Sequence, residues 1–292
     1  MNQIELINVR KDYTTKTLGT VTAVNNFNLT IKKGECFSFL GPSGCGKTTT
    51  LRMLAGFEDL SEGEIRLEGK VVSNKAKNLY VPPEHRNLGM VFQAFAVWPH
   101  LNVFDNVAFP LQVQKRPKAE IEERVNLALK QTNLLDQAKV FPSDLSGGEQ
   151  QRIALARSIV VNPGILLLDE PLSNLDPKLR ESMRFEIKRL QKEYNFTIVF
   201  VTHDQSEALA LSDRLLVMNK GEIIQIGTPQ ELYNKPVNLF VHNFLGESNF
   251  TKVEYRDGKV YAEGDTTQPL PCTIQHMDKA VKLATRPSEI EI

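Results

Sequence analysis

Cysteine is scarce in this sequence, and long hydrophobic runs are lacking. The 292 residues include three cysteines, Cys36, Cys45 and Cys272. An odd number this low argues against a disulfide framework and is typical of a reducing cytosol. No stretch approaches the ~18 consecutive apolar residues of a membrane-spanning helix, and the N-terminal segment lacks the apolar core of a signal peptide. If the protein moves a solute across a membrane, we expect another chain to form the path.

An excess of charge of either sign is also lacking. Lys plus Arg and Asp plus Glu both number 35, so the formal net charge is zero. Global charge therefore favours neither nucleic acid nor anionic lipid as a partner, although a local basic patch stays open. The length suits one large domain with a small appendage.

The polarity pattern predicts strands that alternate with helices. Alternating polarity at residues 4–9 and 27–31 indicates half-buried strands, and apolar runs at 36–40, 165–168 and 197–201 indicate buried ones. Helices are predicted at residues 49–54, 118–138, 149–160 and 179–194. Strands that alternate with helices are typical of a mostly parallel α/β sheet.

The pattern of polarity changes towards the C-terminus. Residues 251–263 alternate in polarity around a predicted turn, and residues 281–284 have the pattern of one more strand. We therefore predict two domains, a large one over residues 1–243 and a small β-rich appendage over residues 244–292.

A phosphate-binding loop follows the first buried strand. The pattern G-x-x-x-x-G-K-[ST] is matched in full by Gly41, Pro42, Ser43, Gly44, Cys45, Gly46, Lys47 and Thr48, and Thr49 continues into the helix. Backbone N–H groups of such a loop point at phosphate oxygens, which requires glycine wherever a Cβ would clash. Lys47 would place its charge near the β- and γ-phosphates, and the Thr48 hydroxyl would ligate Mg²⁺. The strand before and the helix after make a chance glycine-rich turn a poor alternative.

Two adjacent carboxylates follow the apolar strand that ends at Leu168. The carboxyl ends of parallel strands lie beside the crevice where ligands bind. Asp169 would hold Mg²⁺ through water, because this ion keeps part of its hydration shell. Glu170 would polarise the attacking water as a general base. A pair of solvated charges is the alternative, and the phosphate loop weakens it.

A third motif brings a family resemblance. Residues 145–152 read Leu-Ser-Gly-Gly-Glu-Gln-Gln-Arg and resemble the signature of ABC-type ATPases, with Glu149 where the usual form has glutamine. The order of motifs is similar as well: the phosphate loop, Gln93, the signature, Asp169 with Glu170, residues 173–176 and His203. The resemblance covers about residues 3–240. It implies an α/β P-loop NTPase, with a RecA-like parallel sheet core, antiparallel β and helical subdomains, which hydrolyses ATP with Mg²⁺.

The resemblance implies roles for further side chains. Gln93 would help to bind Mg²⁺ and sense the γ-phosphate. His203 would contact the γ-phosphate and orient the water with Glu170. Tyr13 lies at a position like that of the aromatic residue that stacks on adenine; a strand-surface tyrosine is the alternative.

The signature implies a second copy of the chain. Ser146, Gly147 and Gly148 lie where a helix is predicted to begin, and a helix N-terminus is an anion site. In the family this site closes over the γ-phosphate of ATP bound to the other subunit, so the resemblance implies a head-to-tail homodimer with two sandwiched ATP molecules. Asp176 belongs to the segment expected along that interface. ATP binding would close the pair, and hydrolysis would reopen it.

An apolar, aromatic stretch between Phe95 and Val103 indicates the branch of the family. It resembles importers of the polyamine, ferric-iron and sugar type, as do residues 201–210 and 227–232. The functional interpretation is a groove for a short helix of a membrane permease, and the plainer one is a helical-subdomain core; both are retained. We expect a peripheral protein on the cytoplasmic face of a bacterial membrane, served indirectly by a solute-binding protein.

The appendage is similar to the same branch. Residues 245–250 and 284–290 resemble landmarks of an accessory OB-like β-barrel domain, of which we expect only a part. A packing or dimer-supporting role and a regulatory role stay equally open. For the solute, the resemblance puts ferric iron first and a polyamine second.

Two other functions are weighed against solute import. A non-transport ABC ATPase that acts on nucleic acid or ribosomes would carry two nucleotide-binding halves, long coiled-coil insertions or zinc-binding cysteines. This sequence has one half, no heptad run and scattered cysteines. A P-loop kinase or GTPase has no use for the signature. We therefore predict ATP-driven import through a separate permease, with no nucleic-acid partner.

Overall fold

A parallel sheet forms the centre of the larger of two compact units, which span residues 1–232 and 233–292. The structure is a computed structural model, and it describes residues 2–15, 19–257, 259–264, 267–270 and 281–286. The domain boundary predicted after residue 243 lies within the smaller unit. As an assignment of functional domains it stays a prediction.

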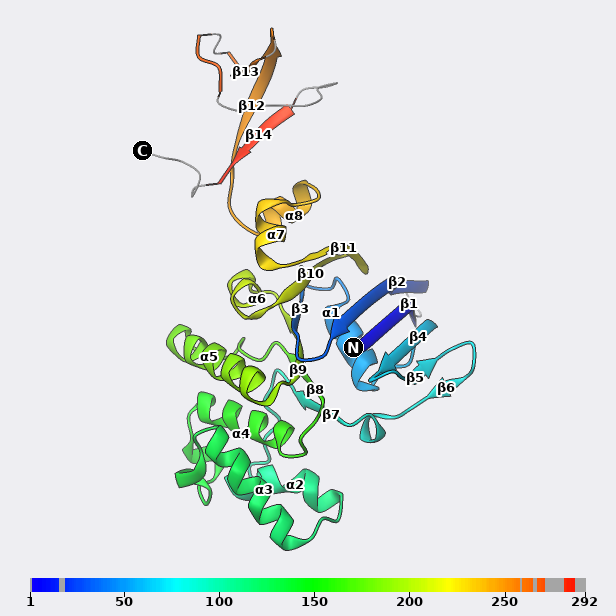
Figure 1. Ribbon diagram of the computed structural model, residues 1–292, viewed down its shortest axis with the longest axis vertical. Helices are drawn as coiled ribbons and strands as arrows, with labels where there is room; N and C mark the ends of the chain where they lie inside the picture. The colour runs from blue at the N-terminus through cyan, green and yellow to red at the C-terminus, as the bar shows by residue number, and fades with distance from the viewer. Residues whose placement is uncertain (1, 16–18, 258, 265–266, 271–280, 287–292) are drawn as a thin grey trace. The chain divides into compact units, whose positions relative to one another are not determined.

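The central sheet has six strands among the described residues: β3 (Cys36–Leu40), β7 (Leu88–Val91), β8 (Ile165–Asp169), β9 (Thr197–Thr202), β10 (Arg214–Asn219) and β11 (Glu222–Gly227). Their order is β11-β10-β3-β9-β8-β7 (Figure 1). All neighbouring pairs are parallel except β10 and β11, which are antiparallel. Every residue of β3, β8 and β9 is buried, which confirms the three buried strands predicted from apolar runs.

A second, antiparallel sheet packs against the first through helix α1. Its strands are β1 (Asn2–Thr15), β2 (Gly19–Lys32), β4 (Glu62–Leu67), β5 (Lys70–Asn74) and β6 (Leu79–Tyr80), in the order β2-β1-β4-β5-β6. Phe27 of β2, Phe39 of β3 and Leu51 of α1 share one hydrophobic core. The rings of Phe27 and Phe39 meet edge to face at 6.0 Å. β1 and β2 are longer than the polarity pattern predicts, because their far ends pair with each other.

Eight α-helices lie among the described residues, and the four that the sequence predicts all differ in extent from their predicted bounds. The eight are α1 (Lys47–Ala55), α2 (Val103–Val113), α3 (Lys118–Gln131), α4 (Gly147–Ile159), α5 (Pro177–Tyr194), α6 (Gln205–Leu211), α7 (Pro229–Asn234) and α8 (Leu239–Phe244). α3 ends before its predicted end at residue 138, because the Thr132 hydroxyl donates to the Ala128 carbonyl oxygen at 2.9 Å and Asn133 turns left-handed at φ 55°. α4 begins at Gly147, two residues earlier than predicted, because Ser146 caps it.

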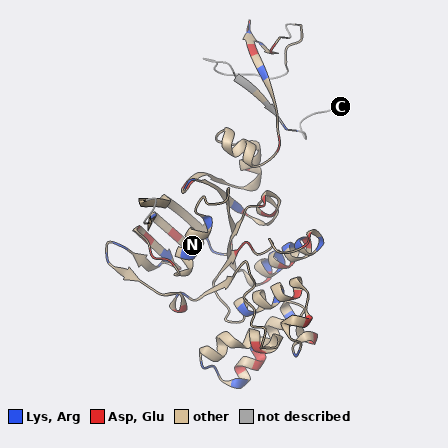
Figure 2. Ribbon diagram, turned by 180° about the vertical axis from the view of Figure 1, so that it is seen from behind, with Lys and Arg blue, Asp and Glu red and all other residues tan. Residues whose placement is uncertain are grey.

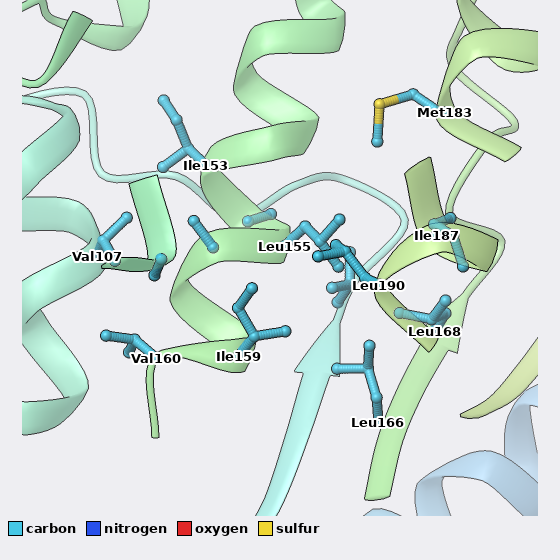
Figure 3. Close-up of a cluster of buried hydrophobic side chains, with 14 of the residues drawn as sticks. Val107, Ile153, Leu155, Ile159, Val160, Leu166, Leu168, Met183, Ile187 and Leu190 are labelled. Carbon is cyan, nitrogen blue, oxygen red and sulfur yellow. The ribbon is translucent and has the colours of Figure 1, made fainter. Parts of the chain in front are cut away.

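The side chains of β8 alternate between two hydrophobic cores. Leu166 and Leu168 belong to the core that α4 and α5 cover, whereas Ile165 and Leu167 belong to the core on the α1 side. Figure 3 shows Leu166 and Leu168 beside Leu190 of α5. With both faces of the strand covered, its charged residues lie at the carboxyl end.

The buried side chain of Arg86 forms hydrogen bonds with the C-terminal turn of α1. This side chain is 5% exposed. The guanidinium donates to the carbonyl oxygens of Val81 at 2.7 Å, Met53 at 2.7 Å and Leu54 at 2.9 Å, and to the Ser73 hydroxyl at 2.8 Å. Burial lowers the pKa of Arg86 to about 10. A charge taken out of water in this way is tolerated because acceptors surround it.

The smaller unit contains a three-stranded antiparallel sheet. Its strands are β12 (Asn249–Arg256), β13 (Lys259–Ala262) and β14 (Val281–Thr285), in the order β13-β12-β14. The β-rich appendage predicted from the sequence is therefore present. Arg286 is buried beside this sheet and stacks over the Tyr233 ring at 3.9 Å. Gly258 of the predicted turn and residues 287–290 of the second landmark lie outside the described residues.

The surface of the larger unit carries charges of both signs. Figure 2 shows Lys and Arg interspersed with Asp and Glu along the helices. Within the part of the chain that the structure describes, none of the helices has the length and apolarity needed to cross a membrane.

Replacing Arg86 by leucine should lower the free energy of unfolding by about 3 kcal/mol, because several buried carbonyl oxygens lose their donor. Urea unfolding of the full chain measures this difference. Arg66→Leu is the matched control, since the Arg66 side chain is 41% exposed beside Glu64. Equal effects of the two substitutions would contradict a structural role for Arg86.

Candidate active site

The phosphate loop connects β3 to α1 as the sequence predicts, and two of its glycines have no room for a side chain. A Cβ on Gly41 would lie 2.5 Å from the Met218 carbonyl oxygen, and one on Gly46 would lie 2.4 Å from the Ala23 carbonyl oxygen. Gly46 also adopts φ 106°, a left-handed conformation that other residues rarely reach. The close backbone approach keeps the loop tight, and α1 then begins at Lys47.

Lys47 points into the loop. Its side chain is 6% exposed, and Nζ donates to the carbonyl oxygens of Gly41 at 2.6 Å and Pro42 at 3.0 Å. The ammonium group is thus enclosed by the loop and by the positive end of α1. Both features favour an anion at this position.

A cavity of about 530 Å³ opens at the loop and gathers residues from separate segments. Its lining consists of Ala23, Ser43, Gly44, Gly46, Lys47, Thr48, Thr49, Gln93, Glu170 and His203. Gln93, Glu170 and His203 come from three segments that are distant in the sequence, and the sequence singles out each of them. Ala23 of β2 carries no motif, so sequence reasoning missed it. The carboxyl ends of β3, β8 and β9 bring these parts together.

Asp169 lies beside the phosphate loop at the end of β8. Thr48 Oγ1 donates to Asp169 Oδ1 at 3.3 Å. Burial raises the pKa of the Asp169 carboxyl, and the hydrogen bond from Thr48 opposes that shift. A hydroxyl and a carboxylate side by side suit Mg²⁺, which binds through one or two protein oxygens together with phosphate oxygens. Among the described residues no cluster of three or more His, Cys, Asp or Glu could hold a metal ion unaided.

One oxygen of Glu170 faces two further predicted residues. Glu170 Oε2 accepts from Gln93 Nε2 at 3.2 Å and lies 3.3 Å from His203 Nδ1. The backbone of Glu170 is left-handed at φ 45°, and its N–H donates to the Val201 carbonyl oxygen at 3.0 Å. A non-glycine residue in this conformation is strained and needs support from its surroundings. The adjacent strand β9, which Val201 belongs to, provides that support.

Residues that follow Glu170 also contact the backbone of Gln93. The sequence did not predict this contact. Asn174 Nδ2 donates to the Gln93 carbonyl oxygen at 2.9 Å, and the Ser173 hydroxyl donates to the Glu170 carbonyl oxygen at 3.0 Å. The position of Ser173 and Asn174 directly after the carboxylates was the only signal in the sequence. The backbone of Gln93 is therefore fixed by Asn174, which is distant from it in the sequence.

The signature residues do not line this cavity. Ser146 precedes Gly147 and Gly148 at the N-terminus of α4 and forms a capping box with Glu149. The Glu149 carboxylate accepts from the Ser146 N–H at 2.8 Å and from the Ser146 hydroxyl at 2.6 Å. These hydrogen bonds keep the pKa of Glu149 below its ordinary value. The ionised carboxylate of Glu149 therefore accepts hydrogen bonds at the N-terminus of α4.

Asp176 and Tyr13 also lie apart from the cavity lining. Asp176 caps α5 by accepting from the Leu179 N–H at 3.1 Å. Tyr13 lies on β1, where the Lys11 ammonium sits 4.9 Å from the centre of its ring. Its role in adenine stacking stays a prediction, as does the dimer role of Asp176.

Comparison with known proteins identifies the family. Residues 24–173 match the ABC transporter family. The chain is 47% identical to the spermidine/putrescine import ATP-binding protein PotA of Haemophilus ducreyi, over 99% of this chain and 77% of that protein. The chain belongs to the ABC transporter family. It is also 50% identical to the trehalose/maltose import ATP-binding protein MalK of Thermococcus litoralis, over 79% of this chain and 62% of that protein. This ABC ATPase thus falls in the importer branch, as the sequence predicted.

Solved ABC structures have the same fold. The dimeric structure of MJ0796, described as a bacterial ABC transporter cassette, matches with a TM-score of 0.67 and 34% identity, over 77% of this chain and 98% of that one. The cbiO1 protein of Clostridium perfringens, part of the complex cbiONQ, matches with a TM-score of 0.71 and 30% identity, over 80% of this chain and 91% of that one. Both matches confirm the predicted ABC ATPase fold. The family and its import ATP-binding relatives confirm the assignment of the chain as an ATPase.

Replacing Lys47 by alanine should raise the Kd for ATP on the order of tenfold or more, because the enclosed ammonium is lost from the phosphate loop. Equilibrium binding of ATP to the full chain measures this change. Lys75→Ala is the control, since Lys75 is 48% exposed and pairs with Asp59 away from the loop. Unchanged affinity of the Lys47 variant would contradict the assignment of the loop.

Proposed function

We propose that this chain is the ATP-hydrolysing subunit of a bacterial ABC importer, and that it acts on the cytoplasmic face of the membrane beneath a separate permease. The observation that carries the proposal is the convergence of Gln93, Glu170 and His203 on the phosphate-loop cavity. A nucleotide site of this kind couples binding, hydrolysis and release to domain movement.

Glu170 is the general base in this proposal. Its carboxylate takes a proton from water as the water oxygen attacks the γ-phosphorus of ATP, and the bond to the leaving ADP oxygen breaks. His203 and Gln93 orient the water and contact the γ-phosphate, and Lys47 stabilises negative charge on the phosphates. Thr48 and Gln93, with Asp169 through water, would hold Mg²⁺, which when bound neutralises phosphate charge.

A second copy of the chain supplies the signature. Ser146 to Gly148 lie at a helix N-terminus and do not line the cavity of their own chain, and in this proposal that helix end meets the ATP bound by another subunit. A head-to-tail homodimer with Asp176 near the interface follows. The dimeric form of the related MJ0796 cassette supports this arrangement.

An apolar groove is the proposed docking surface for the permease. A cavity of about 600 Å³ is lined by side chains that include Phe57, Met90, Trp98, Phe109, Val113 and Val161. Phe57, Phe109 and Val113 are exposed although they are large and hydrophobic. The sequence pointed to the stretch from Phe95 to Val103, and of this stretch Trp98 lines the groove. A short amphipathic helix of a permease would cover these side chains.

A polyamine is the proposed solute. Relatives at 45–50% identity include several spermidine/putrescine import ATP-binding proteins and one trehalose/maltose protein. These relatives move the proposal from ferric iron, the first expectation from the sequence, to a polyamine. The solute itself would be bound by the permease and by a solute-binding protein.

Replacing Glu170 by glutamine should slow ATP turnover by about 100-fold or more, because the amide cannot accept the proton of water. ATP binding should persist, so the variant should accumulate as an ATP-bound dimer. Phosphate release and size-exclusion chromatography measure the two effects. Glu193→Gln, at a side chain 48% exposed, is the control. Near-normal turnover would remove Glu170 as the base.

Replacing Trp98 by alanine should reduce transport more than basal ATP hydrolysis, because the groove loses its largest aromatic side chain while the phosphate loop is untouched. Uptake of labelled spermidine into vesicles by the complex with its permease measures transport, with maltose and ferric iron in parallel. Phe141→Ala, at an aromatic residue 46% exposed outside the groove, is the control. A parallel loss of both activities would count against a docking role, and co-purification with ribosomal RNA instead of a permease would overturn the import proposal.

A further inference from the structure

The segment from Gln93 to Trp98 connects the active site to the groove, and its middle is strained. Phe95 and Ala96 are consecutive non-glycine residues in the left-handed region, at φ 56° and 50°. The Ala96 N–H donates to the Ala94 carbonyl oxygen at 2.5 Å, which closes a three-residue turn around Phe95. A turn of this kind with positive φ is rare and persists only where its surroundings hold it.

Arg157 of α4 supplies that support. Nη2 donates to the Phe95 carbonyl oxygen at 2.9 Å, and Nη1 donates to the Ala96 carbonyl oxygen at 2.6 Å. The guanidinium also lies over the Trp98 ring, 4.5 Å from its centre. Burial lowers the pKa of Arg157. Within the described residues no carboxylate lies within 4.0 Å of this guanidinium, which instead contacts two carbonyl oxygens and an aromatic face.

The two ends of the same segment are fixed by separate side chains. At the active-site end, Asn174 holds the Gln93 carbonyl oxygen. At the groove end, the buried Asn106 accepts from the Trp98 N–H at 2.8 Å and donates to the Trp98 carbonyl oxygen at 3.0 Å. Arg157 therefore holds the strained middle of the segment in place between its two fixed ends.

We propose that Arg157 is a positioning residue that transmits the state of the permease groove to Gln93. The proposal rests on the proposed functions of Gln93 at the γ-phosphate and of the groove at the permease. A displacement of Trp98 by a docked helix would act on Arg157, which holds the turn that determines where Gln93 lies. Because Arg157 belongs to the signature helix α4, the same contact would link the groove to the dimer interface.

Trp98 makes this contact observable, because it is the single tryptophan of the chain. Binding of Mg-ATP to the wild-type full chain should change the Trp98 emission, since Gln93 and Trp98 belong to one held segment. In Arg157→Lys the charge remains, but an ammonium lacks the planar fork that reaches both carbonyl oxygens. We expect the emission change to disappear, kcat to fall on the order of tenfold to a hundredfold, and the KM for ATP to stay within about twofold, since the phosphate loop is unaltered.

A matched control and a rescue separate positioning from simple folding. Arg124→Lys on α3 alters a partly exposed arginine that pairs with Glu120, and it should leave kcat and the emission change as in the wild type. Ala96→Gly added to Arg157→Lys should restore part of kcat, because glycine adopts positive φ without strain and the turn then needs less support. Thermal unfolding of each variant accompanies the kinetics.

The outcomes are distinct. A normal kcat and a normal emission change in Arg157→Lys overturn this proposal while the ATPase function stands. A loss of kcat that follows a lower Tm and is not rescued by Ala96→Gly also overturns it, since Arg157 would then be structural. Failure of the wild-type chain to bind or hydrolyse ATP would instead overturn the proposed function itself.

Discussion

Burial of the parallel strands on both faces is the constraint on which the rest of the structure depends. β3, β8 and β9 are covered by one hydrophobic core on the α1 side and another beneath α4 and α5. Charged groups are therefore confined to the strand ends, and parallel strands share one carboxyl edge. The phosphate loop, Asp169, Glu170 and His203 all follow such ends. The packed core thus fixes where the backbone of each of these groups lies, and side-chain contacts such as that between Gln93 and Glu170 then relate them to one another.

The packed core also supports strained backbone conformations around the cavity. Glu170, Phe95 and Ala96 are left-handed, and each is held by a neighbour from another element. The carbonyl oxygen of Val201 in β9 accepts from the Glu170 N–H, and Arg157 in α4 donates to both carbonyl oxygens of the turn. Conformations that would be unfavourable in a free loop are maintained because packed strands and helices surround them.

Helix α4 has a central place in this arrangement. Its N-terminus bears the signature, capped through Ser146 and Glu149, and its later turns carry Arg157 towards the segment that contains Gln93. The helix packs against α2, α3 and β7, and Ile153 and Leu155 belong to the hydrophobic core on this side of the sheet. A helix packed in this way would move as a rigid body. Such a movement would couple the partner subunit, the nucleotide and the permease to one another.

The separate motifs around the cavity were readable from the sequence because each of them is local. A phosphate loop, a pair of carboxylates after an apolar run and a capped helix are each made by consecutive residues, and backbone geometry relates such residues directly. Contacts between distant segments were not readable. Ala23 in the cavity, Asn174 on Gln93 and Arg157 on the strained turn have no neighbouring pattern that marks them. The order of the strands and the packing of the helices bring these residues into place. Both depend on the simultaneous packing of many buried side chains from distant parts of the chain.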